Sequence, residues 1–170
     1  MNNNNLIVLL RTFSKKEISE FSEFLESSFY NKRKAVIKLY ELLRKYHPDY
    51  EESHVTKEKI FAGLFPGKEY SDSSLRVLIH YLTDLAEKFL TLKKFESNKV
   101  EYSLLLQNVL FERSHDKLFE KSLSKIQDIH DSMSTNAEDY FFNKFRLVNQ
   151  LTYYRFAYNY AYTDRILSEP

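Results

Sequence analysis

The chain of 170 residues contains no cysteine, only two glycines and only three prolines. Without a thiol, disulfides, thiolate zinc sites, iron–sulfur clusters and cysteine nucleophiles are all excluded. The scarcity of glycine and proline disfavours β-rich folds, because tight turns consume these residues. An excess of charge of one sign is lacking as well, since 25 basic residues stand against 24 acidic ones. No overall field therefore draws the chain to nucleic acid or to an anionic membrane.

Long hydrophobic runs are also missing. The only sustained apolar run near the start is Leu6 to Leu10, and it follows four asparagines instead of a basic segment. Such a run is too short for a membrane span, and its flanking residues do not fit a signal peptide. We therefore expect a cytoplasmic protein without a membrane partner.

What the sequence does contain is apolar residues at helical spacing, with start and stop signals between them. Ser14-Lys15-Lys16-Glu17 has the form of a capping box, which predicts a helix from Lys15 to about Phe29. A second helix is predicted after Asn31, and Pro48 stops it. These two helices are therefore expected to cover most of the chain between Lys15 and Pro48.

Two more helices follow in the same half. Thr56 is placed to cap a short helix, which Pro66-Gly67 terminates. Ser71 or Asp72 then caps a longer helix with the strongest amphipathic pattern in the chain. Together these signals predict a compact bundle of about five helices over residues 1–95.

Beyond residue 96 the pattern changes to helices of similar length with short polar breaks, over residues 98–112, 116–132 and 137 to about 163. Asn136 is placed to cap the last of them. Glu101-Tyr102 recurs as Asp139-Tyr140, at an offset that is roughly the size of a tetratricopeptide repeat. The predicted fold class is all-α, with an N-terminal helical bundle over residues 1–95 and antiparallel helical hairpins over residues 96–170, as in a tetratricopeptide-like repeat array.

The end of the chain is rich in aromatic residues, with ten of them among the 23 positions from Tyr140 to Tyr162. They occupy more than one face of the expected helix, so that helix needs neighbours on both sides. We expect that the natural chain continues past Pro170, or that this helix docks on a partner protein or on a second copy. The function predicted is that of a non-enzymatic helical scaffold or protein-interaction module with aromatic anchors. The predicted partner-binding residues are Tyr153, Tyr158, Tyr160, Tyr162, Arg146 and Arg155.

No motif indicates a reaction class. The segment from Gly63 to Lys68 is one residue short of a phosphate-binding loop and follows no strand, so we interpret it as a helix stop. His80, Asp84 and Glu87 share one helical face, which fits a metal site or an acid–base pair and fits a solvated polar face better. We therefore expect no enzyme, with no catalytic residue, metal ion, cofactor or small-molecule substrate.

An alternative function is nucleic-acid binding. Lys32, Arg33 and Lys34 form the densest basic cluster, beside a predicted helix start where they are placed to contact phosphate. The neighbouring Phe29 and Tyr30 are expected to pack under the following helix. A solvated first turn is the simpler interpretation of the cluster.

A second pattern for this alternative lies in residues 56–90. It consists of Thr56-Lys57-Glu58-Lys59-Ile60, Leu64-Phe65-Pro66-Gly67 and Ser74-Leu75-Arg76-Val77-Leu78-Ile79-His80-Tyr81-Leu82. These segments resemble the helix–turn–helix of winged-helix regulators that precede tetratricopeptide-type activator domains. The resemblance implies a DNA-binding module in which the helix from Asp72 faces the major groove, with Arg76 and His80 as contacts.

A further combination of segments covers most of the first 95 residues. It consists of Leu10-x-x-Phe13-Ser14-x-x-Glu17, Phe24-Leu25-x-Ser27-Ser28-Phe29-Tyr30-Asn31-Lys32, Tyr46-His47-Pro48 and Leu64-Phe65-Pro66-Gly67 through Leu75-Arg76. In this combination the chain resembles uncharacterised all-helical proteins of Bacteroidota-type bacteria. The resemblance implies a helical shape and no particular activity, so it adds no catalytic or binding residue.

Overall fold

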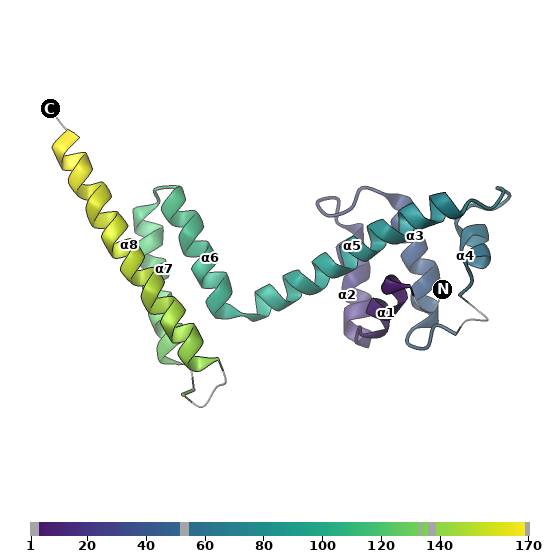
Figure 1. The fold of residues 1–170 in the computed structure, drawn as a ribbon, viewed down its shortest axis with the longest axis horizontal. Helices are drawn as coiled ribbons and strands as arrows, with labels where there is room; N and C mark the ends of the chain where they lie inside the picture. The colour runs from purple at the N-terminus through teal and green to yellow at the C-terminus, as the bar shows by residue number, and fades with distance from the viewer. Residues whose placement is uncertain (1–3, 52–54, 133, 136–138, 169–170) are drawn as a thin grey trace. The chain divides into compact units, whose positions relative to one another are not determined.

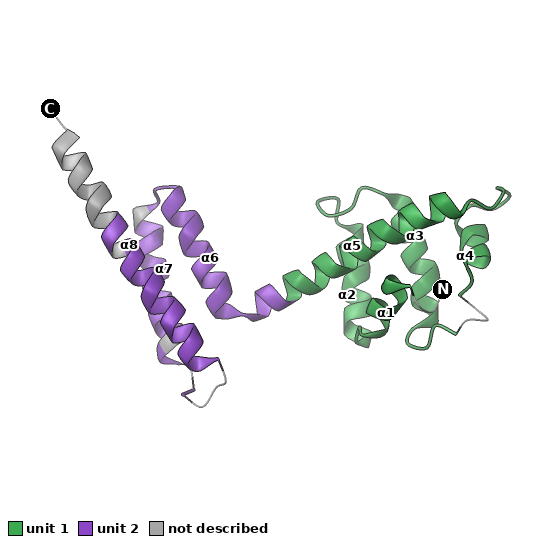
Figure 2. Cartoon of the chain, viewed as in Figure 1, with its two compact units in different colours: residues 1–93 green, residues 94–170 purple. Residues whose placement is uncertain are grey.

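The structure is a computed structural model that describes residues 4–51, 55–132, 134–135 and 139–168 (Figure 1). Within the helices, residues 116, 130, 155 and 158–168 are described by their backbone alone. Across this part of the chain the regular elements are helices, and no residue lies in a strand. The predicted all-α fold class is confirmed. The chain divides into two compact units, residues 1–93 and residues 94–170 (Figure 2).

The described residues of the first unit form α1 (Asn5–Arg11), α2 (Lys15–Glu26), α3 (Lys34–Leu43), the short 3-10 helix η1 (Arg44–Tyr46), α4 (Lys57–Leu64) and α5 (Asp72–Ser97). The last few residues of α5 belong to the second unit. In this unit α3 packs against α2 and α4. All five α-helices contribute buried side chains to one hydrophobic core. The apolar stripe of α5 that enters this core consists of Leu75, Leu78, Ile79, Leu82, Ala86 and Phe89.

Aromatic rings fill the centre of this core. The ring of Phe21 lies 4.9 Å from that of Tyr40, 5.2 Å from that of Phe89 and 5.5 Å from that of Phe13, measured between centroids. The Tyr40 hydroxyl donates a hydrogen bond to the carbonyl oxygen of Ile18 at 2.6 Å. A buried phenol thus keeps a partner while its ring packs among apolar neighbours.

Two of the predicted helix starts in this unit are confirmed by their caps. The Ser14 Oγ accepts a hydrogen bond from the Glu17 amide at 3.2 Å, and the Glu17 carboxylate accepts one from the Ser14 amide at 2.8 Å. This is the reciprocal capping box, and α2 begins at Lys15. Thr56 caps α4 through a hydrogen bond from the Lys59 amide at 3.3 Å.

Two local predictions were wrong. α2 ends at Glu26 instead of near Phe29, whereas the next helix begins at Lys34, after Asn31 as predicted. Phe29 is 83% exposed and does not pack under the following helix. The reason is the side chain of Asn31, which is buried. Its Nδ2 donates to the carbonyl oxygen of Leu25 at 3.0 Å, so the chain turns early and Phe29 is directed outward.

The second unit contains α6 (Lys99–Glu112), α7 (Asp116–Asp131) and α8 (Tyr140–Ser168), which run antiparallel in sequence and pack pairwise (Figure 1). Asn98 caps α6 by accepting a hydrogen bond from the Glu101 amide at 3.1 Å. The predicted cap of the last helix, Asn136, and its predicted first residue, Ala137, lie outside the described residues. The described core of this unit contains the cluster of Val100, Leu104, Ile126 and Leu147, and Phe119, Tyr140 and Tyr154 are buried as well.

The tyrosines of the two matching dipeptides, Glu101-Tyr102 and Asp139-Tyr140, have different surroundings. Tyr140 is buried at the start of α8, whereas Tyr102 on α6 is 50% exposed. A repeat places equivalent residues in equivalent positions. The dipeptide therefore does not support a tetratricopeptide-like repeat, although the antiparallel helices fit one.

Candidate functional site

α8 is apolar on two opposite faces. Its inner face carries the buried residues Tyr140, Leu147 and Tyr154. The Tyr154 ring packs on the rings of Phe111 at 4.8 Å and Phe119 at 4.9 Å. The outer face consists of side chains that are between 53% and 76% exposed: Phe141, Phe142, Phe145, Val148, Tyr153 and Phe156. With 3.6 residues per turn, these six positions fall within a sector about 140° wide, opposite the buried one.

A hollow of about 540 Å³ lies beside this outer face, between α6 and α8. Phe145 and Tyr153 line it from α8, together with polar side chains of both helices. The Gln150 Nε2 donates hydrogen bonds to the Leu104 carbonyl at 2.9 Å and to the Asn108 Oδ1 at 3.0 Å. The hydroxyl of Tyr154 donates to the same oxygen of Asn108. These bonds fix the polar floor of a hollow with two aromatic walls.

Arg146 lines the same hollow and is held by an ion pair. Its Nη1 lies 2.6 Å from the Glu101 Oε2, and both side chains are about one third exposed. The hydrogen bond from Arg146 lowers the pKa of Glu101 below its ordinary value. Arg146 therefore stays at the edge of the hollow, with its remaining N–H groups able to donate elsewhere.

The structure brings two of the predicted partner-binding residues together, since Tyr153 and Arg146 line one hollow. The side chains of Tyr158, Tyr160, Tyr162 and Arg155 lie outside the described part of the structure. The sequence-based selection missed Phe141, Phe142, Phe145, Val148 and Phe156 on the outer face. A helical projection of the segment separates them from the buried positions, so the sequence held the signal.

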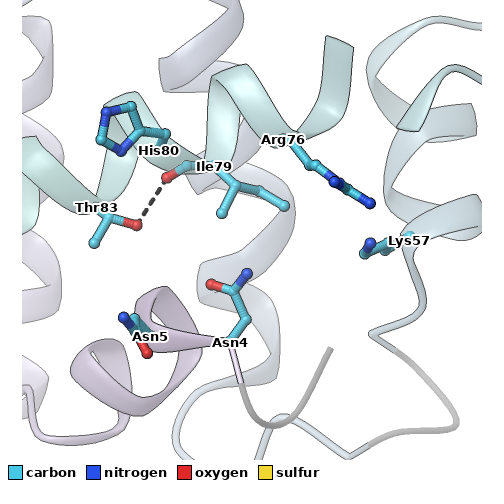
Figure 3. Close-up of a pocket in the computed structure, with 7 residues that line it drawn as sticks. All are labelled: Asn4, Asn5, Lys57, Arg76, Ile79, His80 and Thr83. Atoms are coloured by element: carbon cyan, nitrogen blue, oxygen red, sulfur yellow. Dashed lines mark hydrogen bonds between the residues drawn. The ribbon is translucent and has the colours of Figure 1, made fainter. Parts of the chain in front are cut away.

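A second hollow, of about 470 Å³, lies in the first unit, where the start of α1 and the start of α4 meet the first half of α5 (Figure 3). It contains two residues predicted for the DNA-binding alternative. Its lining consists of Asn4, Asn5, Lys57, Arg76, Ile79, His80 and Thr83.

Asp72 holds the two cations of this second hollow. Its Oδ1 lies 2.8 Å from the Lys57 Nζ, and its Oδ2 lies 2.5 Å from the Arg76 Nε. The Tyr70 hydroxyl also donates to Oδ1, at 3.1 Å. The hydrogen bond from Lys57 is the main cause that lowers the pKa of Asp72, and the hydrogen bond from Tyr70 lowers it further. One carboxylate thus fixes an α4 lysine against an α5 arginine.

The basic cluster at the start of α3 has a different environment. The guanidinium carbon of Arg33 lies 3.7 Å from the centre of the Tyr81 ring on α5, which is a cation–π contact. Lys32 and Lys34 are exposed. The structure therefore places Arg33 against the residue after His80, but outside the hollow that Arg76 and His80 line.

His80, Asp84 and Glu87 are all exposed. This agrees with the interpretation of these residues as a solvated polar face. The His80 Nδ1 lies 3.5 Å from the Asp84 Oδ1. Within the described residues there is no group of three or more His, Asp or Glu side chains arranged to hold a metal ion. In the same residues no helix combines the length and apolar character needed to cross a bilayer.

Comparison with known proteins adds no family to this picture. No protein-family model, no curated protein and no solved structure matches the chain. The features of the described residues that bear on function are therefore the two hollows and the outer face of α8.

Proposed function

We propose that the protein is a non-enzymatic helical interaction module, and that the outer face of α8 binds an amphipathic helix of a partner protein. The observation that carries the proposal is the six exposed apolar side chains on one face of α8. Soluble monomers rarely leave a contiguous apolar patch of this kind in water. The hollow beside Phe145 and Tyr153 supplies a depression for an anchoring side chain.

The energy available at this surface is comparable with the cost of forming a complex. Fully burying one large apolar side chain contributes about 1.5–3 kcal/mol, so four of them contribute about 6–12 kcal/mol. Association costs about 4–15 kcal/mol in lost freedom. Binding is therefore expected where several aromatic side chains are buried together, and a single contact does not suffice.

The charges around the face favour an acidic partner. From Tyr140 to Thr163 the charged residues are Lys144, Arg146 and Arg155, and none is acidic. In the helical projection, residues 144 and 146 lie just beyond opposite edges of the apolar sector. Because Glu101 offsets the charge of Arg146 through their ion pair, the positive charge beside the face comes mainly from Lys144. A second copy of this chain would bring like charges together, whereas a helix with acidic flanks is complementary.

The test uses two designed helical peptides of about five turns with the same apolar stripe, one flanked by glutamates and one by lysines. Fluorescence anisotropy with the full chain is expected to give at least tenfold tighter binding of the acidic peptide. Phe141→Ser and Phe145→Ser should each weaken that binding about tenfold or more, because both side chains are exposed anchors.

Leu118→Ser is the matched control, because Leu118 is a 52% exposed apolar residue on α7, outside the proposed face. Its binding should equal that of the unmodified chain. Equal affinity for both peptides would contradict the acidic partner. A homodimer in sedimentation that Phe145→Ser dissolves would assign the face to a second copy instead.

We also propose a tetratricopeptide-like architecture for the second unit and a location in the cytoplasm. The antiparallel α6, α7 and α8 fit the start of a tetratricopeptide-like array, in which helices present a continuous binding surface. The absence of cysteine suits a reducing compartment, and we place the protein in the cytoplasm.

DNA binding by residues 56–90 is the second candidate function. The side chains of Arg76 and His80 are 72% and 75% exposed on neighbouring turns of α5, which favours it. A duplex is expected to bind at low ionic strength, with an affinity that falls as salt is raised. Absence of binding in an electrophoretic shift assay at low salt would remove this candidate.

A further inference from the structure

The hollow in the first unit concentrates hydrogen-bond donors from separate elements. Asn4 comes from the start of α1, Lys57 from α4 and Arg76 from α5, and Figure 3 shows the ends of the Lys57 and Arg76 side chains next to one another. This inference does not depend on α8, because the residues belong to the first unit.

Several of the acceptors near this hollow are already used. The Asn4 Oδ1 accepts a hydrogen bond from the Leu6 amide at 2.9 Å, which leaves the Asn4 amide group to donate. Both oxygens of Asp72 accept hydrogen bonds from Lys57, Arg76 and Tyr70. The acceptors of the lining that remain are the carboxamide oxygen of Asn5, the ring nitrogen of His80 that carries no proton, and the hydroxyl oxygen of Thr83, whose proton is donated to the Ile79 carbonyl.

The donors are in excess. The bond from Arg76 to Asp72 uses Nε, so the two terminal nitrogens carry four further N–H groups. Lys57 has three N–H groups, and a single bond to Asp72 is formed. The lining thus holds two cations and two carboxamides around one space, with Ile79 as its apolar wall.

We propose that this hollow binds the phosphate group of a small phosphate monoester. A carboxylate is planar and is matched by one guanidinium fork, whereas donors from three elements surround a tetrahedral anion. The hollow of about 470 Å³ exceeds the space of the anion alone. The organic part of the ester then occupies the remaining space of the hollow.

Asp72 is the brace of this site. It fixes Lys57 and Arg76 relative to each other and lowers the net positive charge of the hollow by one. Asp72→Asn removes this negative charge and keeps one oxygen that accepts from Lys57 or Arg76, so we expect the gain in charge to outweigh the lost hydrogen bond and anion binding to strengthen. At about 7 Å in water the effect of one charge corresponds to about threefold in affinity for a monoanion and to more for a dianion, so about threefold is the lower bound for a phosphate monoester.

The test is a titration of the full chain with phenyl phosphate, followed by NMR signals of the Arg76 Nε–H and the Asn4 side-chain amide. Saturable shifts are expected at low ionic strength, with benzoate at least fivefold weaker. Arg76→Gln should weaken phenyl phosphate about tenfold or more, since a charge-assisted hydrogen bond is lost. Asp72→Asn should bind it at least about threefold more tightly.

Lys88→Gln is the matched control, with the same loss of charge on the same helix but outside the hollow. It should bind phenyl phosphate as the unmodified chain does. Equal weakening by Lys88→Gln and Arg76→Gln, or equal affinity for benzoate, would overturn the site. If Arg76→Gln unfolds, the sign of the Asp72→Asn effect decides, because weaker binding there also overturns it.

A short DNA duplex serves as the other arm, since nucleic acid carries the same phosphate chemistry. Competition between inorganic phosphate and phenyl phosphate, with no effect of Arg76→Gln on duplex binding, supports the small-molecule ligand. Duplex binding that requires Arg76 while phenyl phosphate causes no shifts overturns it in favour of DNA.

Discussion

At the scale of single residues, Gln107 on α6 is the most unusual side chain of the second unit. It is fully buried, and neither its Oε1 nor its Nε2 has a hydrogen-bond partner among the described residues. A buried amide without partners costs about 1–3 kcal/mol in desolvation. Gln107→Met keeps the length of the side chain and removes both polar atoms. We expect a rise in the free energy of unfolding of about 1–2 kcal/mol, measured by urea denaturation.

Gln150→Met is the control for this prediction, because it makes the same change at an amide that is satisfied. The Gln150 Nε2 donates to the Leu104 carbonyl and to Asn108. Its removal leaves those acceptors short of a donor, so the variant should lose about 1 kcal/mol or more. Opposite signs for the two variants are the expected result. A loss of stability in Gln107→Met would show that the Gln107 amide has hydrogen-bond partners in solution.

At the scale of elements, the start of α2 depends on a reciprocal cap. Ser14→Ala removes the acceptor for the Glu17 amide and should lower the free energy of unfolding by about 0.5–2 kcal/mol. The hydrogen bonds from Ser14 lower the pKa of Glu17 in the folded state. Glu17 therefore stabilises the fold at pH values above the pKa of the unfolded state, which is about 4.3. This stabilisation is lost as the pH falls through the lower pKa of the folded state.

The pH dependence is tested with Glu17→Gln, which keeps an acceptor but no charge. Its difference in stability from the unmodified chain should be present at neutral pH and shrink below about pH 4. Glu23→Gln on the exposed side of α2 is the matched control and should show a smaller difference. A difference for Glu17→Gln that stays constant with pH would rule out the carboxylate as the source.

Helix starts could be predicted from the sequence because a cap is a local interaction, as at Ser14 and Thr56. The end of α2 could not, since it depends on the buried hydrogen bond from Asn31 to Leu25. The excess of aromatic residues on α8 could be recognised from the sequence, but choosing the exposed ones required the position of the inner face. The hollow in the first unit was missed as a site, because Asn4, Lys57 and Arg76 are brought together only by the packing of α1, α4 and α5.

At the scale of the whole molecule, the two units should open at different free energies. The core of the first unit takes buried side chains from five helices, whereas the buried hydrophobic side chains described in the second come from three, and the buried Gln107 amide has no hydrogen-bond partner among the described residues. Native-state hydrogen exchange in increasing urea should place amides of α6 and α7 in a lower opening than those of α2 and α3. Gln107→Met should raise only the lower opening, because it relieves a cost confined to the second unit. Convergence of all amides on a single opening, raised as a whole by Gln107→Met, would mean that the chain unfolds as one cooperative body.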